Sequence, residues 1–178
     1  MELMSSLSRI KALVENDKNK LFSISLLLIS YFILRLFFQQ LPEAKSVFIF
    51  STGYLVEWFY GFGSYDGEQW NFLIHSTSFV VNESCSGTTF FCLLMSFLIY
   101  KKHLQNISIS WLLLAFPIVI FANTMRVLSA IYLFQTLSFF NADNLQEILH
   151  VAIGSITFLV AFLLITLKLD MQVNKNET

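Results

Sequence analysis

Four long apolar runs dominate the chain. They cover residues 21–39, 88–100, 107–122 and 149–169, and small residues from Ser84 onward extend the second run upstream. A helix that crosses a membrane needs about 20 mostly apolar residues. The pattern therefore predicts an all-α integral membrane protein with about four transmembrane helices.

Two shorter runs, 46–62 and 127–140, mix apolar and polar residues. Glu57 interrupts the first, and Gln135 lies within the second. Short amphipathic helices commonly lie in the membrane interface. We predict two short interfacial helices here, while the pattern leaves open whether either run spans.

Residues 63–84 follow neither pattern. The segment begins with polar residues around Asp66 and continues into a stretch rich in β-branched and aromatic residues. Such a composition is typical of strands. We predict one or two short strands that form a small external β-like flap.

The overall composition supports a membrane protein. Apolar residues make up 56% of the chain and charged residues 13%, whereas soluble domains average about 25% charged residues. The net charge of −1 provides no basic surface for nucleic acid. The lipid bilayer is the partner that this composition implies, and we predict no nucleic acid.

Positive charge predicts the topology. Lys and Arg collect in cytoplasmic loops, and a four-span arrangement places the N-terminal tail, the loop with Lys101 and Lys102, and the C-terminal tail on one side. Spanning by both shorter runs would move Lys101 and Lys102 outside. We therefore expect tails at residues 1–20 and 170–178 around a single membrane domain at 21–169.

This topology brings three polar residues to one face of the membrane. Cys85 falls at the outer start of the second span, Arg126 at the outer end of the third, and His150 at the outer start of the fourth. Ionisable groups at membrane depth are costly and tend to be functional. Their joint placement, more than any one residue, predicts a site.

Each of the three residues suits a catalytic role. A helix N-terminus favours the thiolate of Cys85. His150 can act as a general base and then as a general acid, and Arg126 can stabilise a developing oxyanion with its fixed donors. No cysteine or histidine cluster with metal-ligand spacing occurs, so we predict neither metal nor cofactor.

Four neighbours are candidates for supporting roles. Asn123 lies three residues before Arg126 and shares its helix face. Glu147 lies three residues before His150 and can orient the imidazole, while Gly154 leaves space beside the ring. Gly87 permits close approach of another backbone or a substrate.

Other polar residues fit ordinary structural roles. A cysteine in an apolar helix usually packs as a small hydrophobe, and Cys92 fits that description. A lone histidine near an interface is more often a satisfied polar residue than a catalyst, as for His75 and His103. A lone arginine at a helix end usually reaches lipid headgroups. Arg126 therefore supports a catalytic site only in combination with Cys85 and His150.

Three segments of the chain resemble motifs of the exosortase and archaeosortase family. Residues 83–87 read Glu-Ser-Cys-Ser-Gly, residues 123–126 carry an Asn followed three positions later by Arg, and residues 150–154 carry a His followed four positions later by Gly. The three occur in family order. Glu83 and Ser86 join the supporting candidates through this resemblance.

The resemblance implies a multi-pass enzyme of the bacterial cytoplasmic membrane with its site on the extracytoplasmic side. Cys85 would be the nucleophile, with Arg126 and His150 completing the triad. Family substrates are membrane-anchored proteins with a C-terminal sorting signal. Cleavage at that signal would leave the protein as a thioester on Cys85, and an amine acceptor or water would then resolve the thioester. The alternative is a non-enzymatic scaffold or assembly subunit for export of surface protein or polysaccharide.

Overall fold

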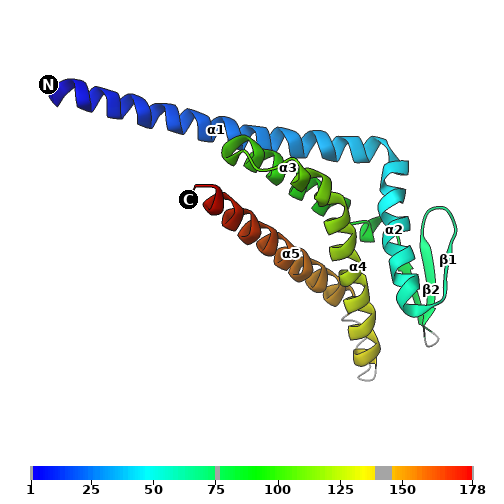
Figure 1. Ribbon diagram of the computed structural model, residues 1–178. Helices are drawn as coiled ribbons and strands as arrows, with labels where there is room; N and C mark the ends of the chain where they lie inside the picture. Colours follow the sequence, from blue (N-terminus) through cyan, green and yellow to red (C-terminus); the bar gives the residue numbers. More distant parts are fainter. Residues whose placement is uncertain (1, 75–76, 139–145, 178) are drawn as a thin grey trace.

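The computed structural model describes residues 2–74, 77–138 and 146–177, with side chains described for 21–74, 78–136 and 151–172. The described chain is mostly helical (Figure 1). In chain order its elements are α1 (Glu2–Gln40), α2 (Pro42–Tyr60), β1 (Gly63–Tyr65), β2 (Trp70–Ile74), β3 (Thr77–Val81), the short 3-10 turn η1 (Glu83–Cys85), α3 (Thr88–Gln105), α4 (Ser110–Ser138) and α5 (Gln146–Glu177).

Within the described part of the chain, four segments are long and apolar enough to cross a membrane. They are Leu21–Gln40, Glu83–Gln105, Ser110–Thr136 and Val151–Gln172. In the first and last, only 11% of the most apolar window is buried within the protein, so both present broad apolar surfaces that suit contact with lipid. The predicted all-α, four-span membrane fold is confirmed.

Two helices run further than the apolar runs suggested. α1 continues from residue 2 through the first span, so the segment expected as an N-terminal tail is helical up to the membrane. α4 continues through residue 138, whereas the sequence suggested a separate short helix over 127–140, of which residues 139 and 140 lie outside the described residues.

α2 begins and ends with ordinary helix signals. Pro42 occupies the first turn, where its missing N–H costs nothing. Gly61 closes the helix with φ +83°, and its N–H donates to the carbonyl of Glu57 at 2.6 Å. The predicted helix over 46–62 is therefore present and begins four residues earlier than expected.

The external flap is a three-stranded antiparallel sheet in the order β1-β2-β3, one strand more than the sequence indicated. Gly63 pairs with Phe72 across β1 and β2, and Phe72 pairs with Phe79 across β2 and β3. Trp70 lies directly against Gly53 of α2, where any side chain would collide with the indole. This contact seats the sheet on α2.

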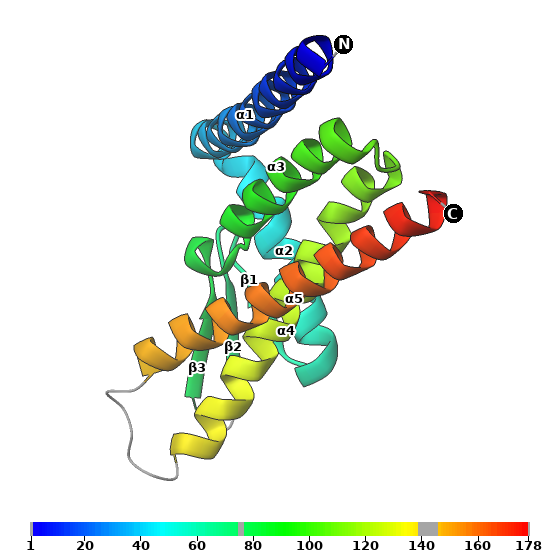
Figure 2. The same cartoon turned by 90° about the vertical axis from the view of Figure 1, so that its left-hand side faces the viewer.

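The two ends of the molecule are formed by different elements. Figures 1 and 2 place both chain termini and the turn between α3 and α4 toward one end, with the sheet toward the other. Lys101 and Asp170 form an ion pair of 2.9 Å between α3 and α5 near the first end. This arrangement matches the predicted topology, in which both tails and the Lys101–Lys102 loop share a side.

Among the residues whose side chains are described, the buried apolar ones form two clusters. The first, here called the helical core, includes Phe48, Cys92, Leu94 and Val119 and lies mainly between the spans. The second, here called the sheet core, lies beneath the strands and includes Cys85. The two cysteines therefore belong to different cores.

Candidate active site

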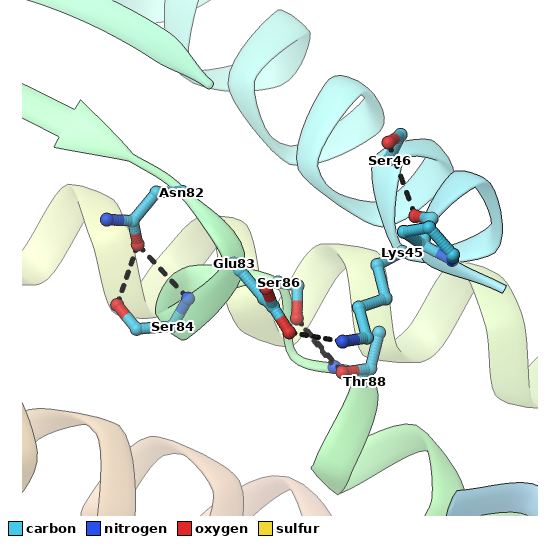
Figure 3. A network of polar contacts seen from close by, with 8 residues as sticks. Lys45, Ser46, Asn82, Glu83, Ser84, Ser86 and Thr88 are labelled. Atoms are coloured by element: carbon cyan, nitrogen blue, oxygen red, sulfur yellow. Dashed lines mark hydrogen bonds and ion pairs between the residues drawn. The ribbon is translucent and has the colours of Figure 1, made fainter. Parts of the chain in front are cut away.

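Cys85 is the last residue of η1, the short turn between β3 and α3. Asn82 caps this turn: its Oδ1 accepts from the Ser84 N–H at 3.1 Å and from the Ser84 hydroxyl at 2.7 Å (Figure 3). The N–H of Cys85 donates to the Asn82 carbonyl at 2.9 Å. The backbone on both sides of the nucleophile candidate is thus fixed by local hydrogen bonds.

The Cys85 side chain is 5% exposed and packs in the sheet core with Val127 and Ile131 of α4. The Ser84 hydroxyl lies 3.8 Å from its Sγ, within hydrogen-bond range for sulfur. Both cysteines of the chain are among the described residues, and neither forms a disulfide. Cys85 therefore carries a thiol at the start of the second span, as predicted.

Asn123 ties this turn to α4. Its side chain is fully buried, and its Nδ2 donates to the backbone carbonyl of Cys85 and, at 3.1 Å, to Oγ1 of Thr52. A carbonyl can only accept, so this contact fixes which end of the amide faces Cys85. The predicted supporting residue therefore holds the backbone of Cys85 itself.

Gly87 and Ser86 complete the motif around Cys85. Gly87 has φ +74°, and a Cβ there would lie 3.1 Å from Cγ of Asn123, so both conformation and space favour glycine. Ser86 is buried, and its hydroxyl lies 3.0 Å from that of Thr88. These contacts join the turn to the first residue of α3.

Arg126 lies one turn beyond Asn123 on α4 and is 8% exposed. Its guanidinium stacks over the ring of Phe158 of α5 at 5.4 Å and interacts electrostatically with Cys85. A Cβ at Gly154 would lie 2.7 Å from Nε of Arg126. Gly154 thus makes room for the guanidinium.

His150 and Glu147 lie within α5, but their side chains lie outside the described part of the structure. Position 150 precedes position 154 by about one helical turn, so the two share one face of the helix. Gly154 lies against Arg126. The backbone therefore places position 150 one turn of α5 before a residue that packs against Arg126.

Glu83 connects the turn to α2 through an ion pair with Lys45. The pair joins Lys45 Nζ to Glu83 Oε1, and Figure 3 shows Lys45 reaching from α2 toward the turn. Lys45 is largely buried, with 17% of its side chain exposed, whereas Glu83 is 70% exposed. The sequence motif marked Glu83 but not its partner.

A cavity of about 510 Å³ opens beside the turn. Ser84, Ser86, Gly87 and Arg126 line it together with residues of α1. Cys85 does not line this cavity, although both of its chain neighbours do. A second cavity, of about 350 Å³, lies on the other side of the Lys45–Glu83 pair.

Comparison with known families agrees with this geometry. The transmembrane exosortase family model matches residues 18–167. The chain belongs to this family. No similar curated protein and no similar solved structure was found.

Membership of the exosortase family supports a sorting-related function in the membrane and leaves the roles of individual residues as predictions. Within this exosortase domain, the structure brings Glu83, Cys85, Ser86, Gly87, Asn123, Arg126 and Gly154 to one end of the spans. His103 instead packs against Phe22 with ring centroids 5.3 Å apart, in line with its ordinary role, and His75 lies outside the described residues.

Sequence reasoning missed Thr52 and Lys45 of α2. Thr52 is fully buried and contacts Asn123, and Lys45 contacts Glu83. Neither belongs to a recognisable motif. The signal for them was weak: a lysine and a threonine seven positions apart in a segment that also contains Ser46 and Ser51.

Proposed function

We propose that this chain is a membrane cysteine transpeptidase or endopeptidase that cleaves C-terminal sorting signals of membrane-anchored proteins. The substrate would carry its signal next to a transmembrane helix, so that the scissile bond lies at the membrane surface. We assign the reaction to the extracytoplasmic face of a bacterial cytoplasmic membrane. No cofactor is required for this chemistry.

The observation that carries the proposal is the convergence of three distant segments on Arg126. Cys85 lies at the start of the second span, Arg126 in the third and Gly154 in the fourth, yet the Arg126 guanidinium packs against Gly154 and interacts electrostatically with Cys85. Burying a guanidinium is costly. Its electrostatic interaction with a thiol, together with the motifs of a sorting family, supports a catalytic use.

The proposed first step is acyl transfer to sulfur. The Cys85 thiolate attacks the scissile carbonyl and forms a C–S bond, while the C–N bond to the leaving segment breaks. Protonated His150 gives its proton to the departing amine. The products are a thioester on Cys85 and a released C-terminal helix with a new amino terminus.

The second step resolves the thioester. An amine acceptor or water attacks the thioester carbonyl, neutral His150 takes the proton of the nucleophile, and the C–S bond breaks to regenerate the thiolate. In both steps negative charge develops on the carbonyl oxygen. Arg126 would stabilise that charge with fixed, partly desolvated donors.

The decisive experiment is mass spectrometry of protein C-termini. Membrane and surface proteins would be compared between cells with the normal chain and cells with Cys85→Ala. We expect at least one protein to lose its C-terminal helix only in the presence of Cys85. The altered C-terminus would identify both the substrate and the cleaved bond.

The opposite outcome is equally clear. If both versions accumulate equally in the membrane and all C-termini are the same, the proposed cleavage does not occur. A non-enzymatic role in export, as a scaffold for surface protein or polysaccharide, would then take precedence.

A further inference from the structure

The helix α2 contacts the turn of Cys85 from two directions. Thr52 Oγ1 accepts from Asn123 Nδ2 at 3.1 Å, and that same amide group donates to the Cys85 carbonyl. Lys45 pairs with Glu83, two residues before Cys85. Thr52 thus acts on the turn through Asn123, and Lys45 acts on it through the side chain of Glu83.

Thr52 and Lys45 lie on one face of α2. They are seven positions apart, nearly two full turns of an α-helix. Figure 3 shows the N-terminal part of α2 facing the turn, with Lys45 bridging the gap. A single rigid helix therefore sets the distance between the two contacts.

The Thr52 contact completes the geometry of Asn123. An amide NH₂ group has two hydrogens, and here one is directed to the Cys85 carbonyl and the other to Thr52. Thr52 and Asn123 are both fully buried. Loss of the threonine oxygen would leave a buried donor unsatisfied and free the amide to rotate away from Cys85.

The Lys45 contact restrains the opposite side of the turn. The Glu83 carbonyl accepts from the N–H of Ser86 at 3.1 Å, so Glu83 is part of the turn's own hydrogen bonding. An ion pair with an exposed partner contributes little to overall stability. Its effect here is on the orientation of the turn.

We propose that Thr52 and Lys45 are positioning residues for Cys85. α2 holds the nucleophile turn between a buried hydrogen bond and an ion pair, and fixes where Sγ lies relative to Arg126. The inference rests on the proposed function for its catalytic readout. It also predicts a change in thiol reactivity that needs no substrate.

The first test uses Thr52→Val and Thr52→Ser. Valine keeps the size of threonine and removes the oxygen, whereas serine keeps the oxygen. We expect Thr52→Val to slow processing by about tenfold to a hundredfold, the range for a reacting group displaced by less than about 1 Å, and Thr52→Ser to restore most of it. The matched control is Thr136→Val on α4, where the threonine is exposed and its hydroxyl donates to the Tyr132 carbonyl of the same helix.

The second test exchanges the charges of the ion pair. Lys45→Glu and Glu83→Lys should each slow processing, because each places like charges together. The double variant restores an opposite pair and should recover most of the activity. A double variant no better than the worse single variant would argue that each side chain acts separately.

The third test follows alkylation of Cys85 by a maleimide in a Cys92→Ala background, across a pH series and without substrate. We expect Thr52→Val to change both the rate and its pH profile, while Thr52→Ser and Thr136→Val match the parent. Equal profiles for Thr52→Val and the parent would overturn the inference. If alkylation shifts as expected but no protein is ever cleaved, the positioning role stands and the proposed function fails.

Discussion

The two cysteines lie seven positions apart and are almost equally buried, with Cys85 5% and Cys92 2% exposed, yet their surroundings differ. Cys92 lies about one turn into α3 in the helical core, packed among apolar side chains, and interacts electrostatically with Arg35. Cys85 lies on a capped turn, with its carbonyl held by Asn123, and interacts electrostatically with Arg126.

The difference teaches that lining a cavity does not identify the nucleophile. Cys92 lines the 510 Å³ cavity and Cys85 does not, so a search by cavity alone would choose the wrong thiol under the proposed function. Thiolate formation requires polar or positive surroundings. An arginine interacts with each thiol, Arg126 with Cys85 and Arg35 with Cys92, so the two regions differ mainly in the polar, capped turn that carries Cys85. The following experiments test how sharply the two regions differ.

The largest expected effect is that of exchanging each cysteine for alanine. With the substrate identified, Cys85→Ala should reduce processing by at least about a thousandfold, as expected for loss of a covalent nucleophile. Cys92→Ala should process at close to the normal rate. Quantitative mass spectrometry of substrate and product, at matched protein levels, measures both, and equal losses would mean that the thiols serve packing.

Arg126→Lys should produce the next largest effect. Lysine keeps the positive charge but loses the planar fork of donors, so we expect processing to fall by roughly a hundredfold to a thousandfold, the range for a removed oxyanion donor. The same assay measures it. A lipid-headgroup anchor would tolerate lysine, and near-normal processing by this variant would place Arg126 in that role.

Gly154→Ala should act through Arg126. The new methyl group would lie 2.7 Å from Nε, closer than atoms can approach, so the guanidinium must move away from its place over Phe158. Alanine is a better helix former than glycine, so α5 itself should not weaken. We expect up to about a hundredfold slower processing with unchanged accumulation in the membrane.

Ser155→Ala is the matched control for that variant. Ser155 is exposed on the adjacent position of α5, and its hydroxyl donates to the Val151 carbonyl of the same helix. It should process normally. Equal slowing by both substitutions would trace the effect to α5 as a whole instead of to the contact with Arg126.

The hydrophobic pattern predicted the spans because lipid contact requires long apolar runs, and all four are present. It did not predict that α4 continues to residue 138. Val127 and Ile131, four positions apart, pack beneath the sheet, so this part of α4 is stabilised by tertiary contact with the sheet core. From sequence alone, residues 127–140 show an apolar face and a polar face. An interfacial helix has the same pattern, so the sequence did not reveal the contact with the sheet.

The site residues that belong to sequence motifs could be predicted from the sequence. The sequence placed Asn123 and Arg126 on one helix face near Cys85, as the structure has them. Gly154 was expected to make space beside His150, yet the side chain described against it is that of Arg126. Such a contact depends on how α4 and α5 pack, and neither helix alone contains that information.

The smallest expected effect concerns the turn between β1 and β2. Asp66 Oδ1 accepts from the N–H groups of Glu68 at 3.0 Å and Gln69 at 2.9 Å, and Asn71 Nδ2 donates to Oδ2 at 3.2 Å. The backbone hydrogen bonds from Gln69 and Glu68, the largest causes, favour the charged carboxylate and hold the pKa of Asp66 below its usual value of 3.8.

A folded-state pKa below the unfolded value stabilises the turn above pH 3.8, and that stability is lost as the pH falls through the lower, folded pKa. Hydrogen exchange should therefore show this turn opening more often in acid, after correction for intrinsic rates. Amides of α3 around Cys92 should not respond.

Asp66→Asn should remove the pH dependence at the turn, because the amide does not titrate. If the turn still opens with acid in Asp66→Asn, another group controls it, and the pH sensitivity of the sheet end is not a property of this carboxylate.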